Sequence, residues 1–162
     1  MEQHTLALGK LVTNLLALET MLRFFLSDID ARAGIPQASL DDLLAASKGA
    51  VFVDCALTNH DSLSTVINKY NAKVTANLAI NRDEIVSLRD AIAHGRLISR
   101  DPTPPLSLFK FSKPADGTVT VTVSETLTLE WLQECTSRIH RDLQNVIAAG
   151  GQLFTGKLFT QE

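Results

Sequence analysis

The chain has 162 residues and 45% apolar side chains, enough for one hydrophobic core without disulfides or a structural metal. Its formal net charge of −3 argues against a protein that coats nucleic acid through bulk positive charge, although a few arginines could still gather around one phosphate. No apolar run is longer than residues 15–18, whereas a membrane span needs roughly 20 residues, and the N-terminus lacks a secretory signal. We therefore expect one domain over residues 1–162, cytoplasmic and without a membrane partner.

The cysteines and histidines form no metal-ligand pattern. Cys55 and Cys135 are far apart, without a Cys-x-x-Cys motif or a nearby histidine pair, so we expect small buried thiols in a reducing compartment. Among the histidines, His4, His60 and His140 are scattered. The sequence therefore predicts no metal and no cofactor.

An amphipathic helix is predicted from about Leu6 to Ile29. At roughly 100° per residue, eight apolar side chains fall on one stripe about 120° wide, which is typical of a helix that faces a core. The stripe consists of Leu8, Leu11, Val12, Leu15, Leu18, Leu22, Leu26 and Ile29. Glu19 lies inside it, and a carboxylate on a buried face needs a cation, hydrogen-bond donors or a proton.

Two further helices are predicted after this one. Ser39 is typical of an N-cap, here for a short helix with acidic residues in its first turn that ends by Gly49. A second long helix is predicted to begin after Thr58 or Asn59, because apolar residues then recur at helical spacing. These residues are Leu63, Val66, Ile67, Tyr70 and Val74.

The second half of the chain predicts two more helices separated by a hairpin. Residues 81–97 form the third long helix, and residues 128–148 form the last, with Thr128 as its N-cap. Between them, residues 106–111 and 118–124 alternate as strands do, around a turn-rich linker. The predicted fold class is therefore mainly all-α, a four-helix bundle with a β-hairpin, residues 106–124, inserted between helices three and four.

The helix at residues 81–97 carries the only chemically suggestive segment. Arg89 and Arg96 are two turns apart at one edge of its apolar face, and Arg82 is in line with them. A guanidinium at a core edge is partly desolvated and favours a paired state. We therefore predict that Glu19 is the structural partner of Arg89.

His94 lies elsewhere on the same helix. It is rotated by about 140° from Arg89, whereas Asp90, four residues before it, is on its side and could orient the imidazole. Arg89 and His94 of one chain therefore diverge. They can meet at one ligand if Gly95 disrupts the helix end, or if a second copy of the helix packs alongside in a two-fold dimer.

Residues 89–94, Arg-Asp-Ala-Ile-Ala-His, resemble the signature of HEPN domains (higher eukaryotes and prokaryotes nucleotide-binding). That signature is an arginine and a polar residue followed by a histidine, with four to six residues between arginine and histidine. The position of the motif, late in the third long helix, also agrees with this family. The motif covers six residues, and nothing else in the chain is specific to the family.

The resemblance implies a metal-independent endoribonuclease of a toxin or defence type that cleaves RNA and acts as a homodimer. An antitoxin or another protein would be a further partner. His94 would be the general base or acid beside a ribose 2′-hydroxyl. Arg89 would stabilise the charge that develops on the phosphate, and Asp90 would support the histidine. The expected product carries a 2′,3′-cyclic phosphate.

One branch of the family, the toxins paired with a nucleotidyltransferase antitoxin, carries a tyrosine two residues after the histidine. Arg96 occupies that position here, so control by adenylylation of such a tyrosine is not supported. Arg96 could instead contact phosphate together with Arg82 and Arg100, or the three arginines could form an ordinary solvated edge.

A non-catalytic interpretation stays open. Arg89 would then only pair with Glu19, and His94 would be a solvated histidine before a glycine that ends its helix. In that case the protein is a helical dimerisation module that binds a protein, a nucleotide or RNA. The two aromatic residues with polar groups, Tyr70 and Trp131, fit core or cleft packing better than base stacking.

Overall fold

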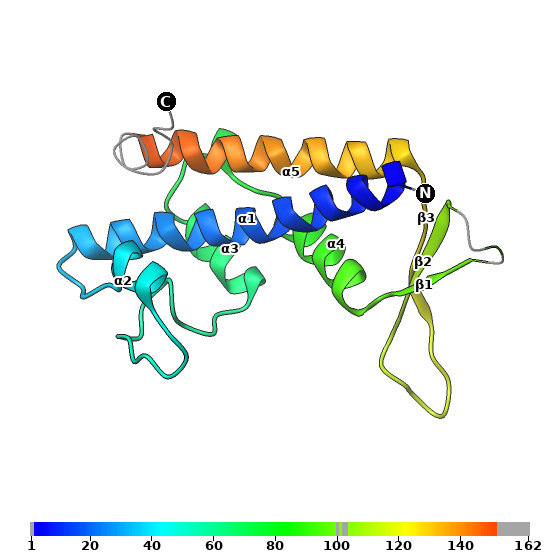
Figure 1. The fold of residues 1–162 in the computed structure, drawn as a ribbon, viewed down its shortest axis with the longest axis horizontal. Helices are drawn as coiled ribbons and strands as arrows, with labels where there is room; N and C mark the ends of the chain where they lie inside the picture. Colours follow the sequence, from blue (N-terminus) through cyan, green and yellow to red (C-terminus); the bar gives the residue numbers. More distant parts are fainter. Residues whose placement is uncertain (1, 100, 102–103, 152–162) are drawn as a thin grey trace. The chain divides into compact units, whose positions relative to one another are not determined.

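A computed structural model describes residues 2–99, 101 and 104–151 (Figure 1). The described chain is mainly helical, as predicted, with a small antiparallel sheet. The helices are α1 (Glu2–Arg32), α2 (Leu40–Ala45), α3 (Leu63–Asn71), the 3₁₀ helix η1 (Ala76–Leu78), α4 (Arg82–His94) and α5 (Leu129–Gly150). The strands are β1 (Arg96–Ile98), β2 (Leu106–Phe111) and β3 (Val121–Leu127).

Local capping signals correctly predicted the starts of α2 and α5. The Ser39 side chain accepts a hydrogen bond from Asp42 N at the start of α2, and Thr128 Oγ1 accepts one from Trp131 N at 3.1 Å before α5. The cap of α3 is Ser62 rather than Thr58 or Asn59. Since α3 has only nine residues, the expectation of a second long helix is wrong.

The contacts divide the chain into two compact units. Unit 1 comprises Met1–Leu16 and Asn81–Arg141, and unit 2 comprises Ala17–Ile80 and Asp142–Glu162. Helices α1 and α5 each contribute to both units. The motif at residues 89–94 and the sheet both belong to unit 1.

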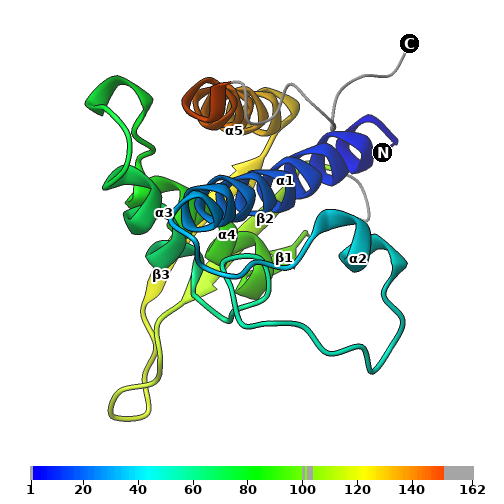
Figure 2. The same ribbon diagram turned by 90° about the vertical axis from the view of Figure 1, so that its left-hand side faces the viewer.

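The sheet of unit 1 has three strands in the order β1-β2-β3. The predicted hairpin is confirmed as β2 and β3, although β3 begins at Val121 rather than Thr118. Strand β1, whose first two residues were predicted to be helical, pairs antiparallel with β2. In both views the tip of the hairpin, residues 112–120, points away from α4 (Figure 1 and Figure 2).

The inward stripes of the two long helices are largely as predicted. In α1, Leu11, Leu15, Leu18, Leu22 and Leu26 are buried, and in α5, Leu132, Cys135, Ile139 and Val146 are buried. Cys55 and Cys135 are both buried, which confirms the prediction of small buried thiols. By length and composition alone, α1 also qualifies as a membrane span, a test that core helices of soluble proteins also meet. The absence of a membrane and the cytoplasmic location therefore stay predictions.

Tyr70 belongs to the buried core of unit 2. It is fully buried, its ring packs edge-on against Phe25 at 5.0 Å between centroids, and its hydroxyl donates to the Leu78 carbonyl at 3.0 Å. Burial, together with the charge of Asp142, raises the pKa of Tyr70 to about 12. The prediction that Tyr70 packs in the core is confirmed.

Alkaline titration should make this burial visible. Tyr70 is the only tyrosine, so tyrosinate absorbance reports on this residue alone. We expect an apparent pKa of about 12 in the folded protein and one near 10.0 in denaturant. The neutral phenol should stabilise the fold fully below pH 10, and that contribution should fade as the pH rises toward 12. An ordinary pKa in the folded state would show that Tyr70 is accessible to water.

Candidate active site

Helix α4 holds the predicted site residues and begins and ends at defined caps. Asn81 Oδ1 accepts from Glu84 N at its start, and Gly95 N donates to the Ala91 carbonyl at its end. The helix therefore stops at His94, and the prediction that it continues to residue 97 is wrong. The cause is tertiary: residues 96–98 pair with β2 and form a strand, which a helical pattern in the sequence could not reveal.

Gly95, directly after α4, lies close against β2. A Cβ at this position would collide with the Ala91 carbonyl oxygen and lie 2.5 Å from Leu108 Cδ1 and 3.2 Å from the Phe109 carbonyl oxygen. Only a residue without a side chain fits such an approach. Gly95 thus allows the chain to pass from the histidine directly into the sheet.

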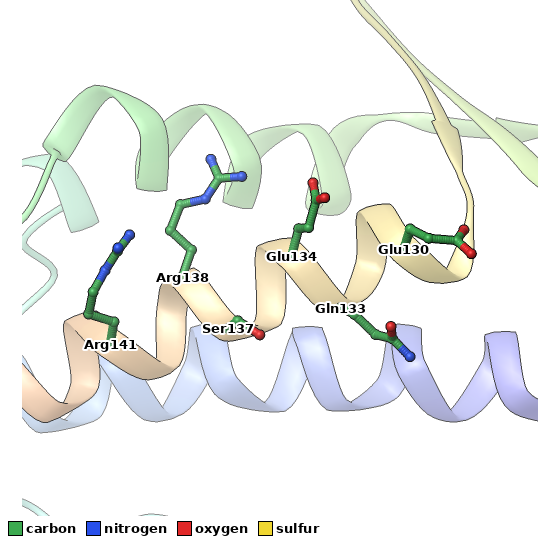
Figure 3. Close-up of a pocket in the computed structure, with 6 residues that line it drawn as sticks. All are labelled: Glu130, Gln133, Glu134, Ser137, Arg138 and Arg141. Carbon is green, nitrogen blue, oxygen red and sulfur yellow. The ribbon is translucent and has the colours of Figure 1, made fainter.

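Two ion pairs hold α4 against its neighbours in unit 1. Near its start, Glu84 pairs with Arg138 of α5, and Figure 3 shows Arg138 pointing from α5 toward α4. Near its end, Asp90 lies 3.8 Å from Lys110 Nζ on β2. With the close contact at Gly95, these pairs fix the helix at both ends. Neither Arg138 nor Lys110 was singled out in the sequence, because nothing local indicates which distant carboxylate each one meets.

Arg89 and Asp90 form an ion pair, with 3.0 Å between Nη1 and Oδ1. Both side chains are about one-third exposed, at 37% and 33%. The other oxygen of Asp90, Oδ2, is the one nearest to Lys110. The carboxylate of Asp90 therefore lies between the cations of Arg89 and Lys110. Among the described residues, no ion pair or side-chain hydrogen bond joins Asp90 to His94. Asp90 thus contacts the arginine and not the histidine that it was predicted to support.

His94 is the last residue of α4, and its side chain is exposed. Both His94 and Arg89 lie within regular helix, so the rotation of about 140° between them persists despite Gly95. The structure thus provides an accessible imidazole at a fixed helix end and an ordered guanidinium five residues earlier. A single helix does not direct both groups at one atom.

The predicted pair of Glu19 and Arg89 is replaced by two other pairs. Glu19 Oε1 binds Arg23 at 2.9 Å, and Arg89 binds Asp90. Arg23 also donates to the carbonyl oxygens of Ala56 and Asp61. The physical argument that a carboxylate on this face needs a cation was correct. The partner is the arginine one turn later on the same helix, which the i, i+4 spacing could have identified.

The three arginines predicted to bind phosphate do not form one edge of a helix. Arg82 pairs with Asp83 at 2.7 Å, which occupies its guanidinium. Arg96 lies on β1 with its guanidinium carbon 5.2 Å from the centre of the Phe111 ring. The prediction that Arg89 and Arg96 are superimposed is therefore wrong, because the helix ends before Arg96. Arg100 is outside the described residues.

A cavity of about 410 Å³ lies beside α4 on the side of β3 and α5. Trp131, which is half-buried, lines it together with Ser87 of α4 and Arg138 of α5. Cys135 also lines it, but burial, with the nearby Glu134 and Glu125, raises the pKa of this thiol to about 11. A thiol with such a pKa is a poor nucleophile at neutral pH, so the cavity offers packing and polar contacts rather than cysteine chemistry.

The described part of the chain contains no group of three or more histidine, cysteine, aspartate or glutamate side chains that could hold a metal ion. Comparisons with protein-family models, curated proteins and solved structures find no match for the chain. Any function must therefore be argued from the residues and their geometry.

Proposed function

We propose that the protein is a metal-independent endoribonuclease with a HEPN-like four-helix bundle, acting as a homodimer through Arg89 and His94. The observation that carries the proposal is the exposed His94 at the end of a helix held at both ends, five residues after an ordered arginine. Cleavage next to a 2′-hydroxyl needs a group that exchanges protons near neutral pH and a cation that binds phosphate. Imidazole and guanidinium meet these two needs.

In this mechanism His94 removes the proton of the ribose 2′-hydroxyl, and the oxygen then attacks the adjacent phosphorus. The bond from phosphorus to the 5′-oxygen of the next nucleotide breaks, and that oxygen leaves with a proton taken from water. Protonated His94 then returns its proton to the solvent. The products are a 2′,3′-cyclic phosphate and a 5′-hydroxyl. Arg89 stabilises the extra negative charge on the phosphate oxygens through hydrogen bonds that a permanently charged guanidinium can donate in pairs.

Asp90 and Lys110 serve as positioning residues in this proposal. Asp90 holds the Arg89 side chain, and Lys110 balances the carboxylate from β2. When phosphate arrives, Arg89 can exchange the carboxylate for the phosphate while Lys110 keeps Asp90 neutralised. The preordered guanidinium then loses little side-chain entropy on binding.

The homodimer is needed because one helix directs Arg89 and His94 apart. A two-fold axis beside α4 would bring His94 of one chain toward Arg89 of the other and produce two equivalent sites. A nuclease of this kind fits a cytoplasmic toxin or defence protein, and an antitoxin would be a natural protein partner. Arg96 at the position of the family's tyrosine leaves no hydroxyl for adenylylation there.

The proposal predicts that purified protein cleaves mixed RNA in the presence of EDTA and runs as a dimer in solution. The new RNA ends should carry 2′,3′-cyclic phosphates, detectable by mass spectrometry and by resistance to a phosphatase until acid opens the ring. DNA of the same sequence is the control, because it lacks the attacking 2′-hydroxyl. Cleavage that requires a divalent metal, or that proceeds equally on DNA, would rule out the mechanism.

A non-catalytic dimerisation module is the alternative, and the ion pair that already occupies Arg89 favours it. Such a protein would dimerise and bind its partner, protein, nucleotide or RNA, without cutting RNA. Intact RNA after prolonged incubation with a well-folded dimer would support this function instead.

A further inference from the structure

The sheet of unit 1 has an outer face that carries two phenylalanines. Side chains alternate between the faces of a strand. In β2, Leu108 is buried and Lys110 approaches Asp90 of α4, so Phe109 and Phe111 lie on the opposite face. Both rings are only partly buried. They are separated by one residue on the central strand, where Phe109 has partners on β1 and β3 and Phe111, at the end of the strand, is opposite Val121 of β3.

The strand register identifies the residues next to these rings on the same face. Arg96 of β1 and Ser124 of β3 are both opposite Phe109, and partners in an antiparallel ladder share a face. The outer face therefore also contains Ile98, Ser107, Val121 and Thr126, through their pairing or alternation with these residues. Glu125, the only acidic residue of the three strands, is opposite Leu108 and thus on the inner face.

Arg96 gives this face its charge. Its guanidinium stacks over Phe111 at 5.2 Å, and among the ion pairs of the described residues none involves Arg96. A protein with a net charge of −3 thus has an aromatic face with a cation and without a carboxylate. Paired aromatic rings beside a stacked arginine are the elements that bind single-stranded nucleic acid, because bases stack on the rings and the cation meets the backbone.

We propose that this outer face, defined by Arg96, Phe109 and Phe111, binds two successive bases of single-stranded RNA next to the scissile phosphate. The inference rests on the proposed function and names the form of its substrate. Arg96 follows His94 by two residues, a separation of roughly 7 Å along an extended chain. RNA held on the face therefore passes close to the catalytic helix end, and duplex RNA, whose bases are already stacked, should be excluded.

Binding of an uncleavable oligonucleotide tests the inference apart from catalysis. The probe is a fluorescent single strand with 2′-O-methyl groups, followed by anisotropy. Phe109→Ala and Phe111→Ala should each weaken binding by about fivefold to a hundredfold, as expected for loss of one stacked base. Arg96→Gln should weaken it less and lower the slope of log affinity against log salt by about one. Duplex RNA should compete poorly.

Matched variants separate stacking from folding. Phe109→Leu and Phe111→Leu keep an apolar side chain without the aromatic ring, so they should lose binding while retaining the melting temperature of the parent. Val119→Ala, at an exposed valine outside the three strands, should bind as the parent does. Leucine variants with unchanged affinity would overturn the inference.

The two proposals can fail independently. If the parent cleaves ordinary RNA in EDTA while the phenylalanine variants bind the probe normally, the stacking face is wrong and the nuclease stands. If nothing cleaves RNA but the variants lose the probe, the face binds RNA in a non-catalytic protein. If the variants instead convert a dimer into monomers, the face is an interface between copies of the chain, and the inference is overturned.

Discussion

Replacement of His94 by alanine is expected to reduce RNA cleavage by about 10²–10⁴-fold, the range that one general acid or base contributes. His94 is exposed at the end of α4, so its loss should leave the melting temperature unchanged and affect chemistry alone. Arg89→Ala should cause a loss of similar size, because no other group would balance the phosphate charge. His140→Ala is the matched control, since this histidine is also exposed but lies on α5. Cleavage that persists in His94→Ala would remove the imidazole from the mechanism.

Mixing the two inactive variants tests where the site is assembled. If each site takes Arg89 from one chain and His94 from the other, a mixed dimer contains one intact site and one doubly altered site. Equal mixing makes about half of the dimers mixed, so activity should recover to about a quarter of the parent value. If both residues act within one chain, no mixed dimer has an intact site. Absence of recovery after verified subunit exchange would therefore contradict a site shared between chains.

The second large effect is expected at Gly95. A methyl group there would meet the Ala91 carbonyl and Leu108 Cδ1, and both atoms belong to packed elements that cannot move freely. We expect Gly95→Ala to lower the free energy of unfolding by about 3 kcal/mol, at the upper end of the usual cost of overpacking. It should also displace His94 and thereby reduce activity. The measurement is denaturant unfolding, with the midpoint and slope compared between parent and variant.

Gly9 provides the matched control for that substitution. It lies within α1 and is exposed, and an added Cβ would meet nothing within 4 Å. Gly9→Ala should therefore stabilise the protein by about 0.5–1 kcal/mol, because alanine loses less conformational freedom in a helix. Equal effects of the two substitutions would show that β2 does not approach Gly95 as closely as described.

Local signals in the sequence predicted much of the secondary structure. Ser39, Thr128 and the apolar stripes of α1 and α5 depend on neighbours within one or two turns, so spacing alone reveals them. The alternation of residues 106–111 likewise predicted β2. Two predictions failed for different reasons. The start of α3 was placed before its local cap, Ser62, whereas residues 96–98 form a strand because they pair with the distant β2.

The same distinction between local and long-range interactions applies to the candidate site. The sequence by itself determined that Arg89, Asp90 and His94 share a helix and that Arg89 and His94 point apart, because helical geometry fixes the angle between positions. Only the tertiary structure decided that Asp90 meets Lys110, and that Arg96 leaves the helix to stack on Phe111. The physical reason is that ion pairs and strand pairing join residues far apart in the chain, and their choice depends on which surfaces the folded backbone brings within a few ångströms.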